Sequence, residues 1–122
     1  MKLHASTAGA ANIVTAYGDD YVTVNGERRK SSVIVTAQGV AAWHPQSFDA
    51  LSADDFKPLA ELGVEIVLLG TGPRQRFPHP RLTAPLAQAR VGLEVMDTKA
   101  ACRTYNILVA EARRVALALV FT

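Results

Sequence analysis

The chain contains the run Met96-Asp97-Thr98-Lys99-Ala100-Ala101-Cys102-Arg103-Thr104-Tyr105-Asn106, which continues to Glu111. This run joins a predicted strand, Gly92 to Met96, to the longest predicted helix, Thr98 to Ala112. Small and apolar residues recur in the helix at helical spacing and form one wide stripe, made by Ala100, Ala101, Thr104, Tyr105, Ile107, Leu108 and Ala112. A strand that leads directly into such a helix indicates a layered α/β fold, in which the helix packs on a sheet.

The entry to this helix is rich in polar side chains. Asp97 and Thr98 are residue types preferred at a helix N-cap, but the same turn follows a buried strand, where open α/β sheets bind ligands. Both roles stay open, and Tyr105 or Asn106 would orient a ligand bound there. Glu111 falls on the apolar side of the helix, so it either pairs with an arginine, serves as a functional carboxylate, or is exposed at the helix end.

A second turn, Gly70-Thr71-Gly72, follows the apolar run Val64 to Leu69, which is typical of a buried parallel strand. Two glycines allow backbone N–H groups to approach a ligand closely, and Arg74, Arg76 and His79 follow within reach of an anion. The turn lacks the Gly-Lys-Ser/Thr ending of a Walker loop and the third glycine of a dinucleotide fingerprint. The sequence therefore leaves open a tight turn or a site for an anion or carboxylate.

Together the two turns predict a candidate ligand site, a cleft between the 70–76 loop and the 96–106 turn and helix. Its candidate residues are Gly70, Thr71, Gly72, Arg74, Arg76, Asp97, Thr98, Tyr105 and Asn106. No catalytic residue can be assigned, because no Gly-x-Ser-x-Gly elbow or comparable nucleophile motif is present. His4, His44 and His79 lack metal-ligand spacing, so we expect no metal and no cofactor.

The first third of the chain is rich in short β patterns. Strands are predicted at Ile13 to Tyr17, Tyr21 to Val24, Glu27 to Thr36 and Val40 to Trp43, with Asn25-Gly26 as a type I′ hairpin turn. Two further helices are predicted, from Ser52 to Leu62 and from Thr83 to Arg90, and a last strand from Val115 to Phe121. This order predicts a β meander followed by an alternating α/β sheet, all in a single domain that spans residues 1–122.

Composition excludes several classes of protein. The formal net charge is only +2, and the densest basic run, Arg28-Arg29-Lys30, would be split between the two faces of a strand. We therefore expect no nucleic-acid partner. No apolar run is long enough to span a membrane, and Met1 to Asn12 has no signal-peptide core. The lone Cys102 excludes an intrachain disulfide, so a reducing compartment, the cytoplasm, is expected.

The chain also resembles a known family. The resemblance is carried by Leu68 to Gly72, by Gly92 to Thr98, and by Ala100-Ala101, Arg103 to Leu108, Glu111 and Arg113. These motifs are similar to those of the Mth-domain family of unknown function. Its eukaryotic members include a mitochondrial complex I assembly factor and the adipogenesis-associated Mth-domain protein. The resemblance implies a three-layer α/β fold with a mixed five-stranded central sheet whose last strand is antiparallel, preceded by an extra β layer.

Two hypotheses for the function follow. The first is a non-enzymatic module that binds a protein partner, such as an assembly or scaffold protein, which is what the resemblance and the missing catalytic motif favour. The second is a protein or enzyme that binds a small anionic ligand in the cleft between the two turns. The oligomeric state is open under both hypotheses.

Overall fold

The computed structural model describes residues 4–5 and 10–122. The central sheet has the strand order β6-β5-β9-β7-β8, with the two-residue strand β1 on the outer side of β6. Strands β2, β3 and β4 form a separate three-stranded sheet. The strands are β1 (His4–Ala5), β2 (Val14–Tyr17), β3 (Val22–Val24), β4 (Glu27–Arg29), β5 (Val33–Thr36), β6 (Gly39–Ala42), β7 (Ile66–Thr71), β8 (Gly92–Met96) and β9 (Val115–Val120).

The directions of the strands confirm the mixed sheet. β7 runs parallel to both β8 and β9, whereas β9 runs antiparallel to β5 on its other side. The last strand of the chain thus lies in the middle of the sheet and joins its parallel half to its antiparallel half. Of the strands predicted as a β meander, β2, β3 and β4 form the separate sheet, which we call the meander, whereas β5 and β6 belong to the central sheet. The Asn25-Gly26 turn has the two positive φ angles, 55° and 76°, that a type I′ turn requires.

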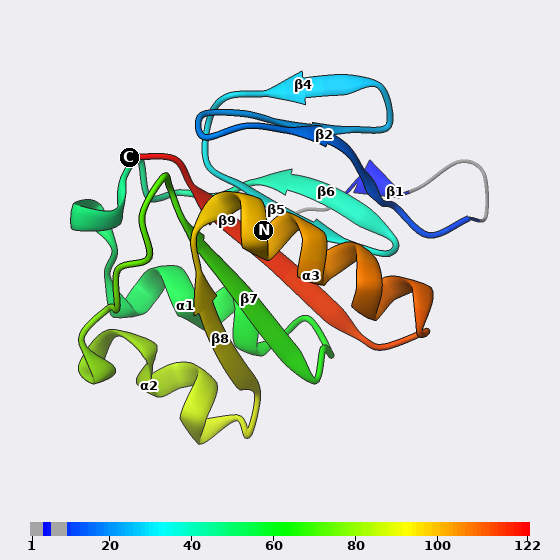
Figure 1. Cartoon of the computed structure of the whole chain (residues 1–122). Helices are drawn as coiled ribbons and strands as arrows, with labels where there is room; N and C mark the ends of the chain where they lie inside the picture. The colour runs from blue at the N-terminus through cyan, green and yellow to red at the C-terminus, as the bar shows by residue number, and fades with distance from the viewer. Residues whose placement is uncertain (1–3, 6–9) are drawn as a thin grey trace.

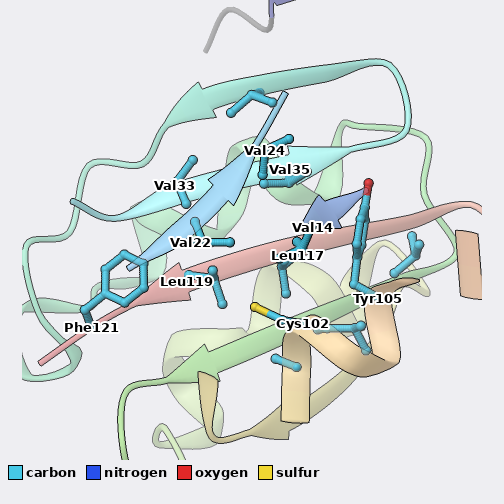
Figure 2. Close-up of a cluster of buried hydrophobic side chains, with 14 residues drawn as sticks. Val14, Val22, Val24, Val33, Val35, Cys102, Tyr105, Leu117, Leu119 and Phe121 are labelled. Atoms are coloured by element: carbon cyan, nitrogen blue, oxygen red, sulfur yellow. The ribbon is translucent and has the colours of Figure 1, made fainter. Parts of the chain in front are cut away.

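The helices are η1 (Phe48–Ala50), α1 (Ala53–Ala60), α2 (Pro80–Gln88) and α3 (Thr98–Ala110). The meander and α3 cover one face of the central sheet, and α1 and α2 cover the other (Figure 1). Figure 2 shows the apolar core of the first face, where the meander valines meet Leu117, Leu119 and the α3 residues Cys102 and Tyr105. The three layers agree with the fold class expected from the sequence.

The predicted return strand from Glu27 to Thr36 is wrong. The structure divides it into β4 and β5, which belong to different sheets. The polar residues Lys30-Ser31-Ser32 separate the two, and burial changes from largely exposed in β4 to fully buried in β5. The chain passes here from the meander to the central sheet. The apolar residues that follow Ser32 are buried on both faces of that sheet.

The start of the second helix is also corrected, from Thr83 to Pro80. His79 is its N-cap, with the Nδ1 atom accepting a hydrogen bond from the Arg81 N–H at 3.1 Å. Pro80 occupies the first helical position, where its missing N–H costs nothing and its fixed φ suits a helix. Histidine is an uncommon cap, so the propensity rules point to Thr83 instead.

The long helix α3 ends two residues earlier than predicted. Ala112 lies beyond it with a positive φ of 59°. Ile107, expected on the buried stripe, is 59% exposed, because the stripe is narrower than predicted and centres on Ala101, Cys102 and Tyr105. Glu111 is exposed at the C-cap, so of its three expected outcomes the structure shows exposure at the helix end.

Candidate functional site

The two predicted turns are in direct contact. The Thr71 hydroxyl lies 2.6 Å from the Arg74 carbonyl oxygen and 3.2 Å from that of Met96, and it accepts a hydrogen bond from the Arg76 N–H at 3.1 Å. A further link comes from the Gln75 side chain, which donates to the Val95 carbonyl at 2.8 Å. Thr71 is fully buried. The hydrogen bonds of its hydroxyl therefore hold the two turns together. We call residues 70–76 with 95–98 the Thr71 junction.

Gly72 and Thr98 complete this junction by a reciprocal pair of hydrogen bonds. The Gly72 N–H donates to the Thr98 hydroxyl at 3.0 Å, and the Thr98 N–H donates to the Gly72 carbonyl at 2.8 Å. Gly72 has a φ of +90°, and a Cβ there would lie 2.9 Å from the Phe121 carbonyl oxygen. A Cβ on Gly70 would overlap Leu119 and crowd Ala101 of α3. Both glycines thus serve close packing, as the tight-turn interpretation expects.

Asp97 is the N-cap of α3, as one of its two predicted roles requires. Its Oδ1 atom accepts a hydrogen bond from the Ala100 N–H at 2.9 Å. Of the two arginines in the loop, Arg74 is exposed. Arg76 instead engages η1, with its guanidinium carbon 4.4 Å from the centre of the Phe48 ring and a nitrogen 3.9 Å from Asp49 Oδ1. Arg76 is therefore engaged by η1 rather than held for a ligand beside Asp97.

Tyr105 and Asn106 serve a different part of the fold. Eight residues of helix, about 12 Å at the helical rise, separate Asp97 from Tyr105. The Tyr105 hydroxyl donates to the Asn12 carbonyl at 2.9 Å, and burial raises the pKa of this phenol. Asn106 accepts from the Val14 N–H at 2.9 Å and donates to the Val14 carbonyl at 2.8 Å. Both residues attach the meander to α3, so the structure does not bring them to the Thr71 junction.

A pocket of about 1040 Å³ lies elsewhere in the described structure, between the meander and the start of α1. We call it the His44 hollow. It is lined by Glu27 and Arg29 of β4, by residues 41–44 at the end of β6, and by Ser52, Asp54, Asp55 and Pro58 around the first turns of α1. The lining combines apolar surface with charged groups of both signs, which is the usual character of a binding site.

One histidine and one buried aspartate form the centre of this hollow. Asp55 is only 5% exposed, and its Oδ2 atom accepts hydrogen bonds from the Ser52 N–H at 2.9 Å and the Ser52 hydroxyl at 3.0 Å. Its Oδ1 atom lies 3.0 Å from His44 Nδ1. The His44 side chain is otherwise 92% exposed. A fixed carboxylate therefore orients an imidazole that is free to bind at its other nitrogen.

Trp43 forms a second link to α1 at this point. Its indole N–H donates to the Asp55 backbone carbonyl at 3.0 Å, and its ring meets Phe56 edge to face. Part of this arrangement has a signal in the sequence, since Ser52 and Asp55 have the spacing of a capping box. No such signal exists for His44, because the contact with Asp55 depends on how β6 packs against α1.

No metal site is formed by the part of the chain that the structure describes, in which no three His, Cys, Asp or Glu side chains come together suitably. Burial raises the pKa of the Cys102 thiol to about 12, so this cysteine is an unreactive core residue. Among the described residues, no helix has both the length and the apolar character needed to cross a membrane.

This architecture defines a class of small three-layer α/β domains that carry an additional β meander. The chain belongs to the family described as "Protein of unknown function (DUF498/DUF598)", which matches residues 14–120. The family resemblance noted in the sequence is thereby confirmed.

A curated relative is the bovine protein named NADH dehydrogenase [ubiquinone] 1 alpha subcomplex assembly factor 3. It is 30% identical over 112 residues, which cover 90% of this chain and 61% of the bovine protein. The chain thus spans less than two thirds of that relative.

Two solved structures share the whole fold. The crystal structure of a protein from Bordetella parapertussis is 45% identical, with a TM-score of 0.86 over 93% of this chain and 98% of the other. The solution NMR structure of a Bordetella pertussis protein, described as a Mth938-like domain, is 40% identical, with a TM-score of 0.78 over 98% and 92% of the two chains.

Proposed function

We propose that this chain is a non-enzymatic module that binds a protein partner and assists the assembly of a larger complex. The observation that carries the proposal is the relationship to the bovine assembly factor, which extends over 90% of this chain. A shared fold alone would support no function, since one fold serves many. The relative's printed role in assembly implies a protein partner.

The hydrogen bonds of the Thr71 junction support this choice over a small-ligand site between the two turns. The Thr71 hydroxyl is bonded to backbone groups of Arg74, Arg76 and Met96. Gly72 and Thr98 are bonded to each other, and Asp97 caps α3. A ligand at this place would have to replace internal hydrogen bonds between buried groups. Each such replacement is costly unless the ligand restores every bond. The single, buried Cys102 is also in keeping with a cytoplasmic location, which we propose for the chain.

The test is native mass spectrometry of the tagged chain, purified gently from its own cells. We expect a stoichiometric complex with another protein. A bare chain, both before and after chemical cross-linking in the cell, would contradict the proposal. A small adduct that is lost in an Arg74→Ala variant would instead support the anionic-ligand alternative and give the mass of the ligand.

A further inference from the structure

The His44 hollow is large enough for part of a polypeptide. Its volume of about 1040 Å³ lies at the upper end of the range for ligand pockets. Ala41, Ala42, Trp43 and Pro58 contribute apolar surface to the lining, and charged groups contribute much of the rest. Such a mixed lining matches long basic side chains, which bury an aliphatic stem and keep a cationic head at the surface.

The rim of the hollow offers hydrogen-bond acceptors. His44 Nδ1 faces the Asp55 carboxylate at 3.0 Å, so in the neutral imidazole the proton lies on Nδ1 and Nε2 is left as an acceptor. The carboxylates of Glu27 and Asp54 add further acceptors, with side chains that are 69% and 82% exposed. A ligand that complements this rim must therefore carry N–H donors.

Charge favours the same kind of ligand. Of the three carboxylates in the lining, that of Asp55 is buried and bonded to Ser52 and His44, so the accessible ones are Glu27 and Asp54. One guanidinium, that of Arg29, lies beside them. Glu27 pairs with Arg29 at 3.3 Å and Asp54 with Lys57 at 2.7 Å. These pairs are exposed, and exposed ion pairs are weak, so an incoming cation can exchange with Arg29 or Lys57.

We propose that the His44 hollow is the docking site for a basic segment of the protein partner. A lysine or arginine of that segment lays its stem on Ala42 and Pro58 and places its head among Glu27, Asp54 and the Nε2 atom of His44. This inference rests on the proposed function, because it identifies the surface through which the module holds its partner.

A fluorescence titration tests the site on the isolated chain, because Trp43 is its single tryptophan and lines the hollow. The probe is an acetylated seven-residue peptide with two arginines, compared with the same peptide carrying glutamine in their place. We expect only the arginine peptide to change the Trp43 emission, and its affinity to fall as salt is added. Absence of a response at millimolar peptide, or an equal response to both peptides, would overturn the proposal.

Two matched double variants sharpen this titration. Glu27→Gln with Asp54→Asn removes two carboxylates from the hollow, whereas Glu94→Gln with Glu111→Gln removes two exposed carboxylates outside it. We expect the first variant to bind the arginine peptide about tenfold more weakly and the second to bind like the original chain. Equal weakening in both would show only a dependence on net charge and would reject the hollow as the site.

The same variants separate this inference from the proposed function. If the partner copurifies with the original chain and equally well with the Glu27→Gln, Asp54→Asn variant, the assembly function stands and the hollow is rejected. If no partner is found but the arginine peptide binds in the hollow, the docking site stands and the assembly function fails. Loss of the partner only in the hollow variant supports both.

Discussion

The Thr71 junction and the His44 hollow are both polar regions at the ends of sheet strands, yet they use their polar groups differently. At the junction, buried Thr71 bonds to backbone groups of the two turns, and the Thr98 hydroxyl accepts a hydrogen bond from the Gly72 N–H. At the hollow, buried Asp55 is satisfied by Ser52 and holds an imidazole that is 92% exposed. A dense polar motif can therefore serve packing alone, whereas an isolated histidine acquires a fixed orientation through a distant neighbour.

The largest effect is expected from Gly72→Ala at the Thr71 junction. The new Cβ would lie 2.9 Å from the Phe121 carbonyl in a backbone with a φ of +90°, which we expect to lower the free energy of unfolding by about 3 kcal/mol. Urea unfolding measures this loss in the free energy of unfolding. Gly63→Ala is the matched control, since Gly63 has a φ of +75° but open space around it, and a loss of about 1 kcal/mol is expected. Equal losses would show that contact with Phe121 is unimportant.

Thr98→Val tests whether the hydrogen bonds of the junction matter. The change keeps the shape of the side chain but leaves the buried Gly72 N–H without its acceptor, so we expect a loss of about 2 kcal/mol in urea unfolding. Thr83→Val removes a hydroxyl that bonds to the Pro80 carbonyl at an exposed position, and it should cost less than about 0.5 kcal/mol. A neutral Thr98→Val would mean that the junction can reorganise, as a ligand-binding turn would.

The pH dependence of stability tests the burial of Cys102 between α3 and the central sheet. Burial raises its pKa from 9.0 to about 12, so the thiol ionises in the unfolded chain before it does in the folded one. The contribution of the buried neutral thiol to the free energy of unfolding is intact below pH 9 and is lost as the pH rises toward 12. From pH 9 to 10 we expect the original chain to lose about 1 kcal/mol more than Cys102→Ala. Identical profiles would mean that water reaches the thiol in the folded state.

His44→Ala is expected to have the smallest effect on folding. Because the imidazole is 92% exposed, the free energy of unfolding should change by less than about 0.5 kcal/mol. Asp55→Ala, which removes the capping box of α1, should cost about 1–2 kcal/mol. If the two variants are equally destabilised, His44 is a structural residue and the difference between the two regions disappears.

The features predicted correctly from the sequence depend on neighbours along the chain. The Asn25-Gly26 turn and the Asp97 cap are fixed by two or three adjacent residues. The errors and omissions depend on distant partners. The placement of β4 and β5 in different sheets depends on the strands that each of them pairs with, and the bond from Asn106 to Val14 joins residues that are 92 positions apart.

The candidate site shows the same division. The sequence identified the residues of the Thr71 junction but could not show that their polar groups would satisfy one another. His44 and Asp55, eleven positions apart, meet only because β6 packs beside α1. Periodicity and capping rules describe each element alone, so they do not predict contacts between side chains of different elements.

The central place of β9 has a consequence for synthesis of the protein. Val115–Val120 is the last strand to leave the ribosome, yet it lies between β5 and β7. Until it emerges, the hairpin of β5 and β6 and the parallel pair of β7 and β8 have no strand to connect them. A chain that ends before Val115 therefore leaves β5 and β7 each with an unpaired edge, and we expect it not to form the central sheet.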